Sequence, residues 1–327
     1  MEQEILLSAR NLKKYFPVKN FLGGKKQYVK AVDDVSFDIF KGETFGLVGE
    51  SGCGKSTLGR TLIRMHDVTD GEIFYQKDNI THIKKSDLKK YHKKMQIIFQ
   101  DPYSSLNPFQ NVEEILREPL SQLKISKAQE LEKMEYLLGK VGMKKEDLEK
   151  FPYEFSGGQR QRIGIARALS VNPEFVMCDE PISALDVSIQ AQVVNMLEDL
   201  QQEFGLTYLF AAHDLSMVRY ISKRIGVMYL GNLVEVSDKD SLYQRPLHPY
   251  TKALFSAIPL ADPKVAKKTN RTILTGELPS PINMPEGCHF VTRCPYATEE
   301  CYTINPKLRL AETGHMVACH NFEKIES

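Results

Sequence analysis

The chain has 327 residues, of which 42% are hydrophobic and 26% charged, values typical of a globular protein with one large or two smaller domains. Its 43 basic and 42 acidic residues give a net charge of +1, so there is no global reason to expect a nucleic-acid partner. No apolar run is long enough to span a membrane, and the N-terminus does not have the pattern of a secretory signal. We therefore expect a cytosolic protein that reaches a membrane only through a partner or a surface.

The N-terminal part of the chain predicts strands before a glycine-rich loop. Residues 4–42 contain the alternating apolar and polar pattern of half-buried strands, and 44–48 form an apolar run that leads directly into glycines. The elements expected next are a helix over 55–66 and strands over 71–76 and 95–100. Residues 81–94 are rich in lysine, and we expect them to form a solvated surface.

Helical patterns dominate residues 111–172, and Gly142 is expected to end one of these helices. Two buried strands, at 174–178 and 206–212, flank an amphipathic helix that ends near Gly205. Residues 224–236 predict a strand, a turn at Gly231-Asn232 and a second strand. This alternation predicts an α/β domain with a largely parallel sheet. A loop-rich tail with prolines and cysteines begins after about residue 260, where we expect a domain boundary.

The glycine-rich loop fits the phosphate-binding pattern G-x-x-x-x-G-K-[ST] at every fixed position. Glycines let successive N–H groups point inward at phosphate oxygens, and the following helix adds the positive end of its dipole. We expect Lys55 to reach the β- and γ-phosphates of ATP and Ser56 to bind Mg²⁺. A strand precedes the loop and a helix follows it, which favours this interpretation over a chance glycine turn. The predicted nucleotide residues here are Gly49, Glu50, Ser51, Gly52, Cys53, Gly54, Lys55, Ser56 and Thr57.

Two carboxylates, Asp179 and Glu180, follow the apolar strand 174–178. Carboxylates at the end of a buried strand are costly unless something pairs them. Asp179 fits a Mg²⁺ partner, and Glu180 can orient and deprotonate an attacking water. The alternative is a solvated strand end before Pro181, and the phosphate loop upstream favours the catalytic interpretation.

Ser156, Gly157, Gly158 and Gln159 precede a helix that runs to about Leu169. Free N–H groups at such a helix start suit a γ-phosphate. The alternative is an ordinary helix start in which Ser156 is the capping residue.

The order of these motifs resembles the nucleotide-binding subunit of ABC transporters over residues 4–260. The resemblance implies that Gln100 contacts Mg²⁺ or water and that His213 contacts the γ-phosphate. It places Phe16 where an aromatic ring stacks on adenine, although its neighbour Tyr15 is an alternative. Residues 183–186 resemble the loop that crosses the dimer interface.

The same resemblance implies a dimer. In the family, the segment that matches Ser156–Gln159 binds the ATP held by the phosphate loop of the opposite subunit. One chain carries one set of motifs, so a second subunit is required. The nucleotide bound to the two subunits then shifts the equilibrium between an open and a closed dimer.

Residues 100–108 and 246–254 are similar to segments of oligopeptide and dipeptide importers, and Asp101-Pro102-Tyr103 resembles the F-type subunit. This implies a P-loop NTPase fold with a mixed sheet core, an antiparallel β subdomain and a helical subdomain at about 100–172, all within 1–260. Residues 261–327 would form the C-terminal region of that transporter type. The implied partners are a paralogous ATPase, giving a heterodimer, two transmembrane permease subunits and an extracellular peptide-binding protein, with this chain peripheral on the cytoplasmic face.

Four cysteines lie in the tail, at Cys288, Cys294, Cys301 and Cys319. Their spacing differs from the paired C-x₂-C of zinc ribbons, and four thiolates in a cytosolic segment suit a 4Fe–4S cluster. The resemblance points the same way. Zinc is the alternative cofactor. A further alternative is that the four cysteines bind no metal and remain free thiols. Under the zinc reading the neighbouring histidines could be ligands, although solvated side chains are more usual: His289, His315 and His320.

The motifs predict an ATPase, and the resemblance implies that it powers import of oligopeptides or dipeptides, with Glu180, His213 and Gln100 acting on the reaction. One alternative is an importer of another small solute, such as nickel. Others are a soluble ABC ATPase that acts on nucleic acid or ribosomes, and an iron–sulfur redox protein.

Overall fold

The computed structural model describes residues 4–18, 26–258, 274 and 276–326. Its contacts divide the chain into two units. The helical unit contains residue 4, Phe40–Thr44 and Ile83–Ala212. The phosphate-loop unit contains Ile5–Ile39, Phe45–His82 and the described residues from His213 onward. The boundary expected near residue 260 lies outside the described residues, so the division at that point stays a prediction.

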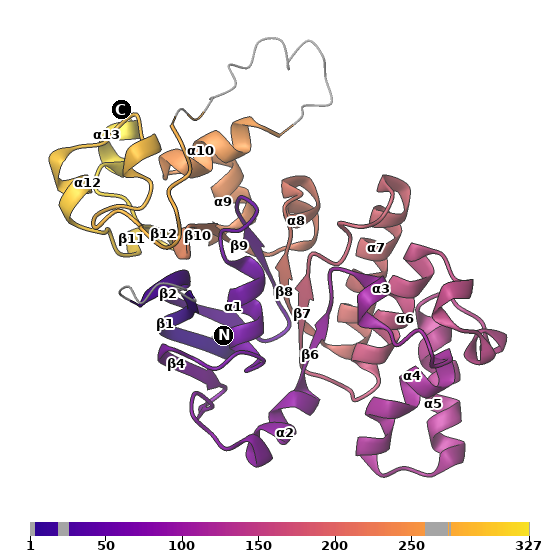
Figure 1. Ribbon diagram of the computed structural model, residues 1–327. Helices are drawn as coiled ribbons and strands as arrows, with labels where there is room; N and C mark the ends of the chain where they lie inside the picture. Colours follow the sequence, from indigo (N-terminus) through magenta and orange to yellow (C-terminus); the bar gives the residue numbers. More distant parts are fainter. Residues whose placement is uncertain (1–3, 19–25, 259–273, 275, 327) are drawn as a thin grey trace. The chain divides into compact units, whose positions relative to one another are not determined.

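An antiparallel sheet in the phosphate-loop unit contains the first long strands. Its order is β2 (Gln27–Phe40), β1 (Ile5–Val18), β4 (Asp70–Tyr75) and β5 (Asp78–Asn79) (Figure 1). The strand β1 pairs antiparallel with β4, with Leu7 opposite Tyr75. Both of these side chains are buried, and the predicted alternation appears at the end of β2, where Val35, Phe37 and Ile39 are buried.

A second set of strands in this unit supports the phosphate loop. The buried strand β3 (Thr44–Val48) runs parallel to β9 (Arg224–Tyr229), and β10 (Asn232–Asp238) returns antiparallel to β9. The predicted hairpin over 224–236 is therefore confirmed. The helices of the unit up to residue 258 are α1 (Lys55–Leu62), α8 (Leu215–Ile221), α9 (Lys239–Gln244) and α10 (Pro249–Ser256).

The tail is more regular than the sequence suggested. Its strand β12 (His315–Val317) pairs antiparallel with β10 and with β11 (Arg309–Glu312), so the tail extends the sheet (Figure 1). These strands have only three and four residues, too few to show a period. The short helical segments described in the tail are η4 (Val291–Arg293), α12 (Glu299–Thr303) and α13 (Phe322–Glu326).

The helical unit contains three parallel strands, β6 (Met95–Ile98), β7 (Phe175–Asp179) and β8 (Thr207–Ala211). Every residue of β7 and β8 is buried, as expected for strands covered on both faces. The helices are α2 (Lys85–Lys94), α3 (Pro102–Ser105), α4 (Val112–Leu120), α5 (Lys127–Lys140), α6 (Gly157–Leu169) and α7 (Val187–Phe204). The 3₁₀ segments are η1 (Ser121–Leu123), η2 (Lys145–Glu149) and η3 (Pro152–Glu154).

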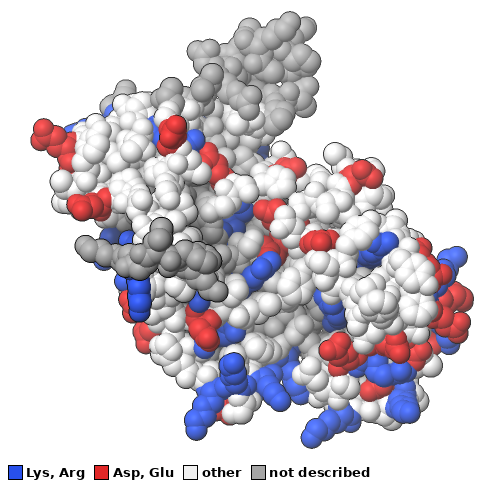
Figure 2. Space-filling model, viewed as in Figure 1, with Lys and Arg blue, Asp and Glu red and all other residues white. Residues whose placement is uncertain are grey.

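Residues 81–94 were expected to be a plain solvated surface, but most of them form α2. Leu88 and Tyr91, three residues apart, are its buried positions, while its lysines keep their charges at the surface (Figure 2). The mixed sheet, the antiparallel sheet and the helices together confirm the predicted fold class. No helix in the described part of the chain is both long and apolar enough to traverse a membrane.

Candidate functional site

The phosphate loop joins β3 to α1 and depends on two glycines. A Cβ atom at Gly49 would lie 2.1 Å from the carbonyl oxygen of Met228, and one at Gly54 would lie 2.1 Å from that of Ala31. Gly54 also has φ +110, which side chains rarely adopt, and it is the N-cap of α1. The backbone therefore curls into a space that any side chain would fill.

Lys55 is 4% exposed, and its ammonium donates to the carbonyl oxygens of Gly49 at 2.9 Å and Glu50 at 3.2 Å. The Lys55 side chain thus folds back onto the loop that the sequence predicts to bind phosphates. Ser56 and Thr57, in the first turn of α1, are half-buried. A buried cation and a tight glycine loop at a helix N-terminus fit nucleotide phosphates, and the hydroxyl oxygen of Ser56 is the group suited to Mg²⁺.

Glu50 is held in place by residues far along the chain. Its backbone N–H donates to the hydroxyl of Tyr250 at 2.9 Å, and its carboxylate accepts two hydrogen bonds from the guanidinium of Arg293, at 3.0 and 3.1 Å. Sequence reasoning missed both residues. Tyr250 lies in a segment that the resemblance flagged, whereas Arg293 lies between two of the tail cysteines and carries no motif of its own.

The carboxylate pair lies in the helical unit at the end of β7. Asp179 is fully buried. Glu180 has φ +46, and its N–H donates to the carbonyl oxygen of Ala211 at 2.8 Å. Gln100, just beyond β6, donates from its side-chain amide to the Glu180 carboxylate at 2.8 Å. The structure thus places Gln100 and Glu180, two of the predicted reaction residues, in direct hydrogen-bond contact.

Ser156 caps α6, as the alternative interpretation expected. Its hydroxyl accepts the N–H of Gln159 at 3.3 Å, and the Gln159 side chain accepts the N–H of Ser156 at 3.0 Å. Both residues are exposed, and Gly157 and Gly158 between them are half-buried. The guanidinium of Arg160 lies 3.9 Å from the ring centre of Tyr103, which connects this helix start to the segment after Gln100. The structure therefore shows a capped helix start whose Ser156 and Gln159 are exposed.

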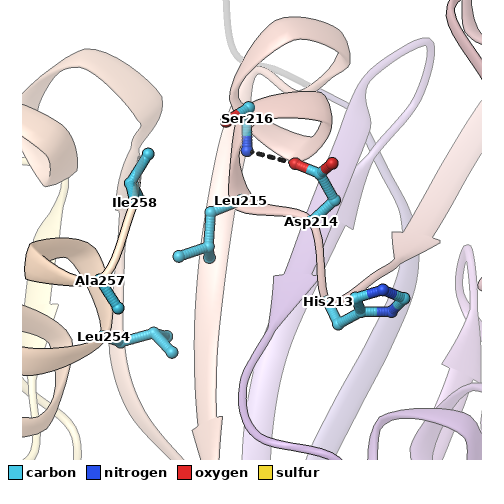
Figure 3. A pocket seen from close by; sticks show the side chains of 7 residues that line it. All are labelled: His213, Asp214, Leu215, Ser216, Leu254, Ala257 and Ile258. Atoms are coloured by element: carbon cyan, nitrogen blue, oxygen red, sulfur yellow. Dashed lines mark hydrogen bonds between the residues drawn. The ribbon is translucent and has the colours of Figure 1, made fainter. Parts of the chain in front are cut away.

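His213 is exposed at the edge of a cavity of about 430 Å³ in the phosphate-loop unit. The cavity walls include Leu215 of α8 and Leu254, the latter on α10 (Figure 3). Asp214 caps α8 by accepting the N–H groups of Ser216 and Met217. The cavity wall is therefore mixed: four of its seven residues are apolar, and the carboxylate of Asp214 lies beside His213 in the chain.

The two candidate aromatic residues differ in their contacts. The hydroxyl of Tyr15 donates to Asp33, and burial together with that carboxylate raises its pKa above the usual range. Phe16 is half-buried and packs edge-on against His66, with ring centres 5.6 Å apart. Because Tyr15 is tied by its hydroxyl, Phe16 remains the better candidate for stacking on a base.

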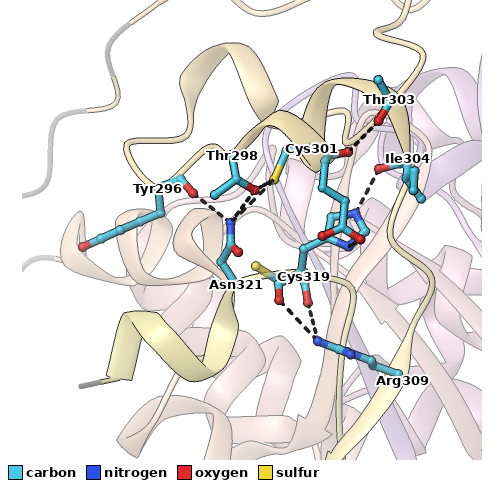
Figure 4. A network of polar contacts seen from close by, with 10 residues as sticks. Tyr296, Thr298, Cys301, Thr303, Ile304, Arg309, Cys319 and Asn321 are labelled. Atoms are coloured by element: carbon cyan, nitrogen blue, oxygen red, sulfur yellow. Dashed lines mark hydrogen bonds and ion pairs between the residues drawn. The ribbon is translucent and has the colours of Figure 1, made fainter.

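The four tail cysteines influence one another. Burial raises the pKa of Cys288 to about 12 and that of Cys319 to about 11, and the neighbouring thiols contribute in both cases. The N–H of Cys288 donates to the carbonyl oxygen of Cys301 at 2.8 Å. The amide of Asn321 donates to the Cys301 sulfur at 3.7 Å, and in Figure 4 the thiols of Cys301 and Cys319 lie near this side chain. All four are free thiols.

The geometry of the tail does not show a metal site. Within the described ranges, no group of three or more His, Cys, Asp or Glu side chains is arranged so that it could bind a metal ion. The nearby histidines also have other partners. His289 bonds the carbonyl oxygen of Leu230, His315 pairs with Glu235 at 2.7 Å, and His320 bonds the carbonyl oxygen of Ile304. His289 and His315 are buried, so the expectation of solvated histidines was wrong for both.

Two family models match the sequence. The model described as "ABC transporter" matches residues 32–183, and "Oligopeptide/dipeptide transporter, C-terminal region" matches 234–301. The second match covers most of β10, α10 and the first three tail cysteines. Tyr250 and Arg293, which sequence reasoning missed, therefore lie within a known family region.

Curated relatives match along nearly the whole chain. The "Putative oligopeptide transport ATP-binding protein YkfD" of Bacillus subtilis is 54% identical, with 98% of this chain and 97% of the relative covered. The "Oligopeptide transport ATP-binding protein AppF" of the same organism is 52% identical, with 97% and 98% covered. Its "Oligopeptide transport ATP-binding protein OppF" is 59% identical, with 80% and 84% covered.

Among solved structures, the dimeric post-hydrolysis state of the ATP-binding cassette MJ0796 bound to ADP and Pi is similar, with a TM-score of 0.64 at 26% identity. The alignment covers 71% of this chain and 98% of that one. The chain therefore contains a complete cassette fold and additional residues beyond it.

Proposed function

Since the chain belongs to the family of ABC transporter ATP-binding subunits of the oligopeptide type, we propose that it hydrolyses ATP to power the uptake of peptides. The observation that carries this proposal is similarity over nearly the full length, tail included, to relatives named for oligopeptide transport. A cassette match alone would support an ATPase of any ABC system. The tail match is what favours peptides.

The proposed roles are those that the motifs and the family resemblance imply for each residue. Lys55 would bind the phosphates, and Ser56 and Asp179 would hold Mg²⁺. When bound, Mg²⁺ would neutralise part of the negative charge of the ATP phosphates. Glu180 takes the proton of the attacking water, and the amide of Gln100, 2.8 Å from it, orients its carboxylate. His213 positions the γ-phosphate.

We also propose that the chain works as one half of a heterodimer with a paralogous ATPase. Ser156 and Gln159 are exposed, which leaves them accessible to the nucleotide of a partner. The proposed further partners are two transmembrane permease subunits and an extracellular peptide-binding protein. The chain would then be peripheral on the cytoplasmic face of the membrane.

A 4Fe–4S cluster held by Cys288, Cys294, Cys301 and Cys319 belongs to the same proposal, with zinc as the alternative. The backbone hydrogen bond that joins Cys288 to Cys301 at 2.8 Å and the resemblance to peptide importers support it. When bound, such a group cross-links a small region that has little core of its own. Anaerobic purification followed by iron and zinc analysis and visible absorbance tests it; protein free of both metals would contradict it.

The test of the transport role is uptake of labelled di- and oligopeptides in cells that carry Glu180→Gln in this chain. We expect peptide uptake to be lost while the mutant protein is present at the normal level. The matched control is Glu203→Gln, which changes an exposed carboxylate in the same unit. Normal peptide uptake in the Glu180→Gln cells would contradict peptide transport and favour another solute, such as nickel, or an ATPase outside transport.

A further inference from the structure

Glu50 and Arg293 form a two-pronged ion pair between the phosphate loop and the tail. The two guanidinium nitrogens of Arg293 lie 3.0 and 3.1 Å from the two carboxylate oxygens of Glu50. The Arg293 side chain is 10% exposed and that of Glu50 is 31% exposed. A planar, paired contact with little exposure is stronger and more directional than an ordinary surface ion pair.

The remaining polar groups of Glu50 are also engaged. Its N–H donates to the Tyr250 hydroxyl at 2.9 Å. Its carbonyl oxygen accepts the Lys55 ammonium and the N–H of Cys53, both at 3.2 Å. Because the side chain and the backbone of Glu50 are fixed together, a shift of its carboxylate would move the loop that holds Lys55.

Arg293 is itself held by buried aromatic residues. It ends the short segment η4, where its N–H donates to the carbonyl oxygen of Phe290. Phe290 is 1% exposed and packs against Tyr229 and Tyr250, with ring centres 5.2 and 5.6 Å apart. The Arg293 guanidinium also lies 3.4 Å from the Tyr229 hydroxyl. The tail therefore presents a fixed cation to the loop.

We propose that Arg293 is a positioning residue for nucleotide binding, which acts through Glu50. It fixes the second residue of the phosphate loop, and it neutralises a carboxylate that would otherwise repel the phosphates of ATP. ATP affinity then depends on a correctly folded tail. This inference rests on the nucleotide-binding role proposed for the phosphate loop, and it does not depend on which solute is transported.

The test is a double-mutant cycle on the purified full chain with a fluorescent ATP analogue. Arg293→Ala leaves Glu50 charged and unpaired, so we expect nucleotide binding to weaken about tenfold. Glu50→Gln alone should weaken it less than threefold, and Glu50→Gln should restore affinity in the Arg293→Ala background. In steady-state hydrolysis, Arg293→Ala should raise KM and leave kcat within about twofold.

Arg245→Ala is the matched control. Arg245 also joins the tail to the rest of its unit through an ion pair, with Glu312, but this pair does not touch the loop. We expect nucleotide affinity to be unchanged in that variant. Arg293→Lys keeps the charge without the planar fork, so it should recover part of the lost affinity and provides a folded variant if Arg293→Ala unfolds.

Three outcomes decide the matter. Unchanged affinity in a folded Arg293→Ala variant would overturn the proposal. A loss that Glu50→Gln does not relieve would also overturn it, because Arg293 would then act through the general stability of the tail. If the wild-type chain binds no nucleotide, and Lys55→Ala is indistinguishable from it, the proposed function of the loop fails instead.

Discussion

The side-chain amide of Gln100 donates a 2.8 Å hydrogen bond to the carboxylate of Glu180. Glu180 has φ +46, a left-handed conformation that costs a residue with a side chain about 1–3 kcal/mol. Its N–H is fixed on the carbonyl oxygen of Ala211, the last residue of β8. The ends of three parallel strands thus hold one carboxylate in a single orientation, as general-base catalysis requires.

Gln100→Ala removes the donor that orients this carboxylate. We expect kcat for ATP hydrolysis to fall about tenfold or more with little change in nucleotide affinity, since the proposed phosphate ligands are untouched. Steady-state hydrolysis and equilibrium binding of an ATP analogue measure the two quantities. Gln96→Ala is the control, because Gln96 lies on β6 of the same unit and its amide donates to the carbonyl oxygen of His92 rather than to Glu180. Equal kcat in the two variants would contradict an orienting role for Gln100.

Two capping boxes with the same geometry separate the two roles of Ser156. Ser156 with Gln159 and Ser126 with Gln129 share hydrogen bonds of 3.3 and 3.0 Å. Ser156→Ala and Ser126→Ala should each lower the free energy of unfolding by about 1 kcal/mol. Only Ser156→Ala should also reduce ATP-dependent association with the partner ATPase, measured by light scattering. If both variants associate normally, Ser156 caps the helix but does not contribute to ATP-dependent association.

Much of the fold could be predicted because the decisive signals are local. The apolar run of β3 followed by glycines, and the alternation at the end of β2, each set an element without help from distant residues. Gly142 and Gly205 end their helices with φ +70 and +64, as a residue without a Cβ permits. The segment α2 was missed because its two buried residues are outnumbered by lysines.

Motifs in the sequence propose the residues of the site, but they do not identify the side chains that hold those residues in place. The left-handed backbone of Glu180 follows from the junction of three strands, and no pattern in the sequence around it shows this. Arg293 meets Glu50 across 243 positions of sequence. Contacts between residues so far apart in the sequence form only in the completed fold. A local motif therefore predicts the place of Glu50 in the loop but not the residue that binds its carboxylate.

A buried carboxylate joins the tail to the sheet. Glu235 is fully buried, accepts the N–H groups of Leu247 and His248 at 2.7 and 2.9 Å, and pairs with His315 at 2.7 Å. Glu235→Ala leaves these groups without their acceptor, so we expect a loss of about 3–5 kcal/mol in the free energy of unfolding. Denaturant unfolding followed by circular dichroism measures it.

The control for this substitution is Glu312→Ala in β11, which pairs with β12 rather than with β10. Its ion pair with Arg245 is half exposed on both sides, so its removal should cost less than about 1 kcal/mol. Similar losses for Glu235→Ala and Glu312→Ala would show that the buried carboxylate contributes no more than a surface pair.

His248 makes stability depend on pH. Burial lowers its pKa from 6.5 to about 4, although the charge of Glu235 opposes the shift, and its Nδ1 accepts the N–H of Tyr250 at 3.1 Å at the start of α10. Between these two pKa values the unfolded chain binds a proton that the folded chain does not. The contribution to stability is therefore intact above about pH 6.5 and falls as the pH is lowered toward 4, by about 2 kcal/mol at pH 5.

His248→Asn keeps a side-chain acceptor for the N–H of Tyr250 and removes the titrating group. We expect the variant to lose about 2 kcal/mol less than the wild-type chain when the free energy of unfolding is compared at pH 7.5 and pH 5. Other groups titrate in both proteins, so the difference between the two pH slopes isolates His248. Identical slopes would contradict the lowered pKa of His248, because the ring would then bind its proton equally well in the folded and unfolded chains.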